Sequence, residues 1–204
     1  MDLFRLRING SKVSLRLLSA GDAPAFLDYL IRNKTAHQPF MPLREADYFT
    51  LETAARVTDQ RRLVEADQQY MFGVFSRETG QLIGKANLSK IIRAAFQNAF
   101  LGYDIDHTVQ NRGYMTEAIR MVTAFGLNAL DLHRIQASIM PRNLASQRVV
   151  ENAGYIREGY SENYVKINGV WEDHFIYAIT CERYHRLPPS LKYAGSIEGA
   201  MTAT

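Results

Sequence analysis

The spacing of apolar residues in the first half of the chain predicts four strands and two helices. Strands are predicted where apolar and polar residues alternate or where aromatic and β-branched residues gather, at 12–18, 70–76, 81–89 and 99–105. Helices are predicted at 20–31 and 51–65. A long proline-containing loop, 33–50, joins these helices, and the turn Glu78-Thr79-Gly80 joins two of the strands.

The second half of the chain is predicted to add two helices and three strands. The first helix follows Gly113 and has one apolar face, made of Met115, Ala118, Ile119, Val122, Phe125 and Ala129. A strand at 134–140 ends at Pro141, and Asn143 and Gly154 are placed as the N-cap and C-cap of the next helix. Asn168-Gly169 separates two alternating runs and predicts a two-residue hairpin.

The order of these elements, β-α-α-β-β-β-α-β-α-β-β, predicts an α+β or α/β protein with a mixed, mostly antiparallel sheet. The chain has 204 residues, of which 47% are hydrophobic and 22% charged, which is ordinary usage for a globular domain. We expect a single domain at 1–184. The segment 185–204 lacks periodicity and is expected to be a flexible tail.

The sequence QNRGYMTEA at 110–118 predicts a site for phosphate. It follows a predicted strand and opens the amphipathic helix, so the first N–H groups of that helix have no partner within it. These donors and the helix dipole favour an anion. Gly113 allows the backbone to approach such a ligand closely.

Two motifs in the right order resemble those of the GCN5-related N-acetyltransferases (GNAT). Gln110-x-x-Gly113-x-Met115 is similar to the loop that binds the pyrophosphate of acetyl-CoA in that family. Asn143-x-x-Ser146, followed by Gly154-Tyr155, is similar to the segment that contacts the pantetheine arm. The resemblance implies the GNAT fold, with a central sheet flanked by about four helices and two central strands that splay apart around the cofactor.

The resemblance also implies which residues bind acetyl-CoA. The open edge of a central strand is expected to pair with the pantetheine amides, and the loop and helix start are expected to hold the pyrophosphate. The expected contacts are Tyr103, Asp104, Ile105, Gln110, Asn111, Arg112, Gly113, Tyr114, Met115, Thr116, Asn143 and Ser146. No metal is expected, because the single cysteine, Cys181, offers no metal-ligand spacing.

Within the family, the chain resembles the RimJ/RimL type, and most of all the RimJ kind. Enzymes of that type acetylate the N-terminal residue of ribosomal proteins, and the RimJ kind acts on the N-terminal alanine of protein S5. The stretches that carry this resemblance are 86–104, 114–118 and 158–174. The resemblance therefore implies an acetyltransferase for a ribosomal protein, with S5 and the small ribosomal subunit as expected partners.

Transfer of an acetyl group to an amine requires a neutral amine, groups that orient the thioester carbonyl, and stabilisation of the departing thiolate. Ser146 is expected to donate to the thiolate, because Val150 stands where many family members have a tyrosine. Glu162 is expected to be the base. The acceptor is expected to contact Asn87, Tyr164, Asp173 and His174, of which Asp173 and His174 are further candidates for the base.

Two alternatives stay open: acetylation of a small amine such as a polyamine or aminoglycoside, and a non-catalytic role as an acetyl-CoA-binding factor in ribosome assembly. The net charge of +3 is not concentrated in a motif for nucleic acid, and no apolar run is long enough to span a membrane. We expect a cytoplasmic protein. In the loop 33–50, Phe40, Tyr48 and Phe49 either line an acceptor pocket or fill the core.

Overall fold

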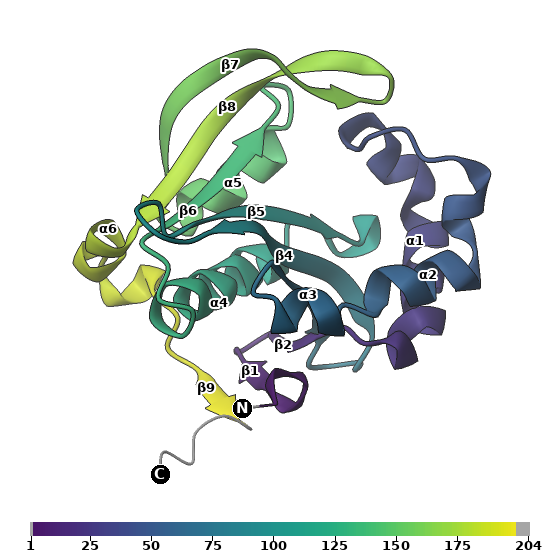
Figure 1. Cartoon of the computed structure of the whole chain (residues 1–204), viewed down its shortest axis with the longest axis horizontal. Helices are drawn as coiled ribbons and strands as arrows, with labels where there is room; N and C mark the ends of the chain where they lie inside the picture. Colours follow the sequence, from purple (N-terminus) through teal and green to yellow (C-terminus); the bar gives the residue numbers. More distant parts are fainter. Residues whose placement is uncertain (1, 199–204) are drawn as a thin grey trace.

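The computed structural model describes residues 2–198 and contains one twisted sheet with helices on both faces (Figure 1). In the described part of the chain the strand order is β7-β8-β6-β5-β4-β3-β2-β1-β9. The strands are β1 Arg7–Asn9, β2 Val13–Leu17, β3 Gln69–Ser76, β4 Leu82–Ile92, β5 Asn98–Ile105, β6 Arg134–Ile139, β7 Ile156–Ile167, β8 Val170–Thr180 and β9 Ser196–Glu198. The helices are α1 Ala23–His37, α2 Leu51–Thr58, α3 Arg61–Glu65, α4 Tyr114–Asn128, α5 Leu144–Asn152 and α6 Cys181–Arg186.

The two central strands separate, as the sequence predicted. β5 and β6 are the parallel pair in the sheet, and they are joined only from Asn98↔Arg134 to Phe100↔Gln136. Beyond Phe100, β5 stays paired with β4 as far as Ile105, while β6 stays paired with β8 as far as Ile139. The mixed, mostly antiparallel sheet with splayed central strands is therefore confirmed.

The helices enclose two hydrophobic cores on opposite faces of the sheet. α4 lies against the larger core and buries the predicted stripe completely at Ala118, Ile119 and Val122. α1 and α2 cover a smaller core on the other face, around Phe26 and Tyr29. Burial of a large apolar side chain contributes roughly 1.5–3 kcal/mol, so these two contacts fix where each helix crosses the sheet.

The predicted second helix is broken in two, because Gln60 leaves the helix to bind the backbone of β3. Its side-chain amide donates to the carbonyls of Leu18 at 2.9 Å and Met71 at 2.7 Å, and its oxygen accepts from Met71 N–H at 2.7 Å. Gln60 is completely buried, so these bonds satisfy groups that water cannot reach. The prediction also ended the first helix too early, since α1 continues to His37.

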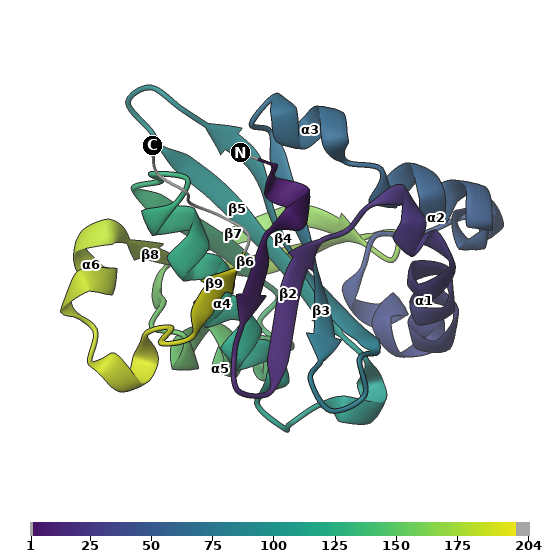
Figure 2. The same cartoon turned by 90° about the horizontal axis from the view of Figure 1, so that it is seen from below.

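The C-terminal segment differs from the flexible tail that the sequence predicted. A 3-10 helix, η6 Pro189–Leu191, follows α6, and β9 then pairs antiparallel with β1 from Arg7↔Glu198 to Asn9↔Ser196 (Figure 2). The Tyr193 hydroxyl donates to the carbonyl of Asn9 at 3.0 Å. The partner strand β1 has only three residues, too few to show a period in the sequence. Residues 199–204 of the predicted tail lie outside the described residues.

Asn168-Gly169 forms the predicted turn between β7 and β8, with both residues at positive φ. The hairpin extends over the molecule towards the end of α1 (Figure 1). Among residues 2–198, no helix combines the length and apolar character that crossing a membrane requires.

Glu117, in the first turn of α4, fastens this helix to the turn between β1 and β2. Its carboxylate accepts from Ser11 N–H at 2.7 Å, Ser11 Oγ at 2.6 Å, Lys12 N–H at 2.8 Å and Val13 N–H at 2.9 Å. Burial would raise the pKa of Glu117, but these hydrogen bonds outweigh it and lower the pKa below its usual value. The charged form is therefore the one that holds the turn in place.

Glu117→Gln is expected to lower the free energy of unfolding at pH 7 by about 1–2 kcal/mol, because an amide accepts fewer and weaker hydrogen bonds and the site is partly screened by solvent. Since the folded pKa is depressed, the stabilisation is present above the unfolded value of about 4.3 and is lost as pH falls through the folded value. Urea unfolding of both proteins between pH 7 and pH 3 measures this. A difference that stays constant with pH would contradict it.

Candidate active site

The edge of β5 that faces the splay carries free backbone groups. Asp106 N–H donates to Ile83 on β4 at 2.8 Å, so by strict alternation the backbone groups of Ile105 and Tyr103 point away from β4. The carbonyl of Ile105 is already taken, because His37 Nε2 donates to it at 2.8 Å. The amides of both residues and the carbonyl of Tyr103 therefore face the gap, as expected for an edge that binds an extended chain.

Asp104, one of the predicted cofactor contacts, has its polar groups directed away from the gap. The same alternation directs its backbone to β4, opposite Lys85. Its carboxylate accepts from Lys85 Nζ and from the hydroxyl of Tyr29, which is completely buried. Asp104 therefore lies in the separated part of β5, but its carboxylate links this strand to Lys85 on β4 and Tyr29 on α1.

The loop 110–113 leaves the start of α4 open to an anion. Gly113 is the N-cap residue, with φ of 80°, and no side chain caps the helix. Asn111 also lies at positive φ, 61°. The first amides of α4, from Tyr114 to Thr116, thus have no capping acceptor. Met115 is buried against the sheet, so it contributes its backbone alone to this opening.

Lys12 is a cation at this loop that the sequence analysis missed. Its Nζ donates to the carbonyl of Arg112 at 2.8 Å and lies 3.3 Å from the position of a Cβ on Gly113. A hollow of about 330 Å³ opens here, lined by Ser11, Lys12, Arg77, Glu78, Arg112 and Tyr114. Lys12 stands 100 residues before Arg112, and only the attachment of its turn to Glu117 brings the two together, so no local motif identifies it.

On the other side of the splay, Asn143 and Ser146 begin α5 as predicted. Asn143 Oδ1 accepts from Ser146 N–H at 3.1 Å, so its oxygen caps the helix and its amide nitrogen is the group left for the cofactor arm. Ser146 Oγ lies 2.7 Å from the hydroxyl of Tyr103, which also donates to the carbonyl of Ser146 at 2.8 Å. Tyr103 thus spans the gap between β5 and α5, a contact that the sequence did not reveal.

Three polar side chains have buried oxygens without a partner among the described residues: Asn87 Oδ1 on β4, Asn98 Oδ1 at the start of β5 and Ser138 Oγ on β6. Asn87 and Ser138 lie beside the separated part of the central strands, whereas Asn98 lies where β5 and β6 are still paired. Asn87 and Ser138 alternate with neighbours that enter the core under α4, so their side chains lie on the face that α1 covers. Asn87 is paired with Gly102, where an added Cβ would meet nothing within 4 Å. Sequence reasoning identified Asn87 but not Ser138.

Glu162 lies in an irregularity between β7 and β8, and Asp173 binds the neighbours of Glu162 there. The register shifts between Ser161 and Val165, and Asn163 takes a φ of 47°. Asp173 accepts from the Tyr160 hydroxyl and from Asn163 N–H at 2.8 Å, and these two bonds lower the pKa of its carboxyl. Asp173 therefore stabilises the bulge in β7. Glu162 lies in the same bulge and is exposed.

His174 is buried, and its ring orientation is fixed. Nδ1 lies 2.9 Å from the carbonyl of Glu172, which can only accept, so Nδ1 carries a proton. In the neutral imidazole, Nε2 then has a free lone pair. The ring of Tyr164 lies 5.7 Å away at an edge-on angle. His174 and Tyr164 are thus neighbours, as their joint assignment to the acceptor requires.

The tip of the β7–β8 hairpin is joined to the connection that follows α1. Asn168 N–H donates to the carbonyl of Met41 at 3.0 Å. Arg142 donates to the carbonyl of Pro39 at 2.8 Å and to Glu172 at 2.7 Å, and its guanidinium lies over Phe40. These contacts form a bridge, made of 38–41 and 167–172, between the connection that follows α1 and the β7–β8 hairpin.

The aromatic residues of the predicted loop 33–50 divide between its two proposed uses. Phe40 belongs to the bridge and is 40% exposed. Tyr48 and Phe49 pack against the smaller core. Filling of the core is confirmed for Tyr48 and Phe49, and the acceptor pocket stays a prediction for Phe40.

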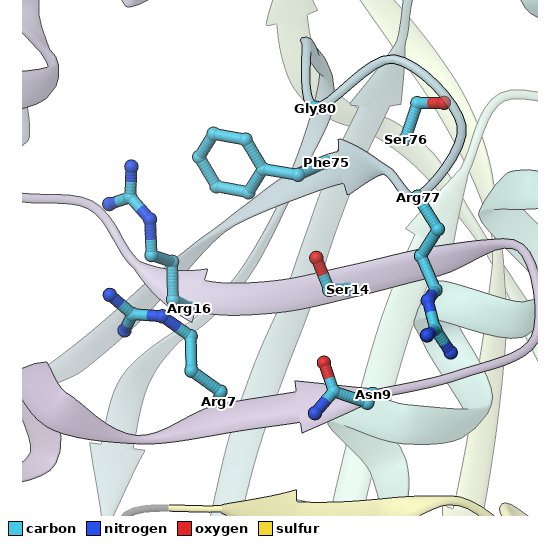
Figure 3. A pocket seen from close by; sticks show the side chains of 8 residues that line it. All are labelled: Arg7, Asn9, Ser14, Arg16, Phe75, Ser76, Arg77 and Gly80. Carbon is cyan, nitrogen blue, oxygen red and sulfur yellow. The ribbon is translucent and has the colours of Figure 1, made fainter.

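A separate basic hollow of about 380 Å³ lies on the outer face of β1–β3 (Figure 3). Its guanidinium groups already have partners: Arg16 is paired with Asp22, Arg7 donates to the Phe4 carbonyl at 3.2 Å, and Arg77 donates to the Gly10 carbonyl at 2.7 Å. This surface carries none of the residues assigned to acetyl transfer. Within residues 2–198, no cluster of three or more His, Cys, Asp or Glu could hold a metal ion.

Comparison with known proteins adds to this geometry. Residues 12–156 match the acetyltransferase (GNAT) domain family. The probable N-acetyltransferase YjcK of Bacillus subtilis is 42% identical over 173 residues, which cover 84% of this chain and 96% of that protein. The ribosomal protein uS5-alanine N-acetyltransferase of Escherichia coli is 29% identical over 177 residues, which cover 86% of this chain and 91% of that protein.

A solved structure shares the arrangement of most of the chain. The ribosomal-protein-S5-alanine acetyltransferase of Vibrio fischeri superimposes with a TM-score of 0.81 at 29% identity, covering 86% of this chain and 97% of its own. Mycobacterium smegmatis RimJ, solved with CoA-disulfide, has the same fold, with a TM-score of 0.82 at 23% identity over 91% of this chain and 89% of its own. The splayed sheet, the open start of α4 and these matches together establish that the chain belongs to the GNAT family of acetyl-CoA-dependent N-acetyltransferases.

Proposed function

We propose that this acetyltransferase modifies the N-terminal α-amine of a ribosomal protein, with the alanine of protein S5 as the leading candidate. The groups on the sheet face that α1 covers carry the proposal, because the partnerless oxygens of Asn87 and Ser138 and the open space at Gly102 suit a primary amine next to a peptide backbone. The S5-alanine acetyltransferases of E. coli and V. fischeri, each 29% identical to this chain, support the choice of substrate.

The cofactor side has the groups that acetyl-CoA requires. The amides at the start of α4 suit the pyrophosphate, with Lys12, Gln110 and Arg112 as nearby polar or cationic side chains. The free edge at Tyr103 and Ile105 suits the pantetheine amides, which would add to β5 as a further strand does. Asn143 Nδ2 lies at the start of α5 for the arm, and Ser146 Oγ for the sulfur.

The acceptor side has groups that suit a primary amine next to a peptide. The partnerless oxygens of Asn87 and Ser138 can accept from the amine or the first peptide N–H. Gly102, with open space above it, lets a backbone approach β5 closely. An α-amine has a pKa near 7.7–8.0, so a weak base suffices to complete its deprotonation. We assign that role to Glu162, with His174 as the competing candidate.

A polyamine is a poorer fit than a peptide, because the acidic side chains of this region are neutralised or held. Glu172 is paired with Arg142, and Asp173 is bound by Tyr160 and Asn163. A polycation needs several free carboxylates, and Glu162 alone fits that description here.

Wild-type protein with acetyl-CoA is expected to release thiol in the presence of a peptide that copies the S5 N-terminus and begins with alanine. The same peptide with a blocked N-terminus is expected to release none, because the attacking α-amine is missing. Thiol detection over time measures both, and mass spectrometry locates the acetyl group. Release with spermidine alone would support the small-amine alternative, and CoA binding without release for any acceptor would support the non-catalytic one.

Gly113→Ala is expected to weaken CoA binding by roughly tenfold, because a side chain at φ of 80° shifts the loop whose amides face the pyrophosphate. Gly80→Ala is the matched control, since Gly80 has a similar φ of 71°, no atom within 4 Å of an added Cβ, and a place in the turn between β3 and β4. Calorimetric titration with CoA compares them. Equal affinity in both variants would remove the loop from the binding site.

Glu162→Gln is expected to lower kcat at pH 7 by about a hundredfold, the effect of losing a general base. The loss should shrink as pH rises through 7.7–8.0, where the α-amine becomes neutral without help. Steady-state rates on the alanine peptide from pH 6.5 to 9 measure this, with His174→Gln in parallel. An unchanged Glu162→Gln enzyme beside an impaired His174→Gln enzyme would transfer the role of base to His174.

A further inference from the structure

Tyr103 is the residue whose side chain crosses from β5 to α5 at the splay. It lies on β5 beyond Phe100↔Gln136, the last pair that joins β5 to β6, and its ring packs against the larger core. Its hydroxyl contacts Ser146 twice, at 2.8 Å to the carbonyl and 2.7 Å to Oγ. A tyrosine needed only for packing would not require a hydroxyl at this place.

The two hydroxyls can be arranged in two ways, because hydroxyl hydrogens rotate. In one arrangement, Tyr103 donates to the Ser146 carbonyl and accepts the hydrogen of Ser146 Oγ. In the other, Tyr103 donates to Ser146 Oγ, and the Ser146 hydrogen is free to point elsewhere. Only the second arrangement lets Ser146 donate to a third group.

Burial keeps the Tyr103 hydroxyl protonated. It raises the pKa of Tyr103 well above its usual value, although the hydrogen bond with Ser146 acts in the opposite direction. A hydroxyl that does not ionise is a constant donor and does not itself deliver a proton. The position that a family tyrosine often occupies is Val150, which is completely buried and apolar.

We propose that Tyr103 is a positioning residue for thiolate departure: when the sulfur of CoA is present to accept from Ser146, the Tyr103 hydrogen turns from the Ser146 carbonyl to Ser146 Oγ, so that Ser146 O–H is directed at the sulfur. The inference rests on the proposed function for the role of Ser146, but not on the identity of the acceptor. In the step concerned, the amine nitrogen bonds to the acetyl carbon and gives its proton to the base. The C–S bond breaks, its electron pair goes to sulfur, and the thiolate is stabilised by the Ser146 hydrogen bond until solvent protonates it.

The first test measures the pKa of the CoA thiol in the complex, without any acceptor, from the ultraviolet absorbance of the thiolate during a pH titration. A donor to the thiolate favours the charged form and lowers this pKa. Tyr103→Phe and Ser146→Ala are both expected to raise it relative to the wild-type complex. Tyr70→Phe is the matched control, because Tyr70 is also buried and its hydroxyl donates to Asp67 Oδ1 at 2.8 Å, not to Ser146.

The second test is a double-mutant cycle on kcat with the amine that the wild-type enzyme acetylates best. Tyr103→Phe is expected to lower kcat roughly five- to tenfold, the value of one hydrogen bond, with the KM for acetyl-CoA nearly unchanged. The double variant Tyr103→Phe/Ser146→Ala is expected to be no slower than Ser146→Ala, because Tyr103 acts through Ser146. Thermal unfolding checks that each variant keeps the fold.

A wild-type thiol pKa in the Tyr103→Phe complex, or effects that multiply in the double variant, would overturn the proposal and leave Tyr103 a packing residue. A shifted thiol pKa together with no acetylation of the alanine peptide would support this inference and reject the proposed substrate. Absence of CoA binding to the wild-type protein would overturn both.

Discussion

The separation of β5 from β6 is the constraint on which the rest of this structure depends. Two strands joined for three residue pairs and then parted leave a row of backbone donors and acceptors that the sheet does not satisfy. His37 donates to one of these groups, the Ile105 carbonyl. The Tyr103 hydroxyl crosses the gap and donates to Ser146, on α5. The remaining groups are polar, aligned and directed into one gap. A gap of this kind is costly to leave dry and unfilled, and it suits a ligand that carries amides at the spacing of a peptide.

Each side of the gap is held by contacts between segments distant in the sequence. On one side, Glu117 secures the turn that carries Lys12, so the loop around Gly113 is supported from the far end of the sheet. On the other, Asp104 is fixed by Lys85 and Tyr29, which ties the splayed strand to α1 and through it to the bridge. The two sides of the gap are thus supported by different carboxylates, Glu117 and Asp104, and a change in one need not disturb the other.

The sequence predicted those parts of the fold and site that depend on local signals. Gly113 before an amphipathic helix, Asn143 as an N-cap and Asn168-Gly169 as a turn are decided by the conformations that a few neighbouring residues allow, and the structure has each of them. Contacts over long distances along the chain escaped prediction. The approach of Lys12 to Arg112, of Tyr103 to Ser146 and of β9 to β1 spans 100, 43 and more than 180 residues, respectively, and no period or motif encodes such a meeting. For Asp104, the sequence predicted the place in the separated strand, but not that the alternation of the strand directs its backbone to β4 and that Lys85 and Tyr29 bind its carboxylate.

The pairing of β9 with β1 has a consequence for the order in which the sheet is built. β1 precedes β9 by more than 180 residues, so during synthesis β1 leaves the ribosome long before the strand that pairs with it. Until Ser196–Glu198 has been made, the backbone groups along β1 form an exposed edge of the kind that attracts other strands. A chain truncated before Ser196 would keep that edge unpaired and would be more prone to aggregate through β1.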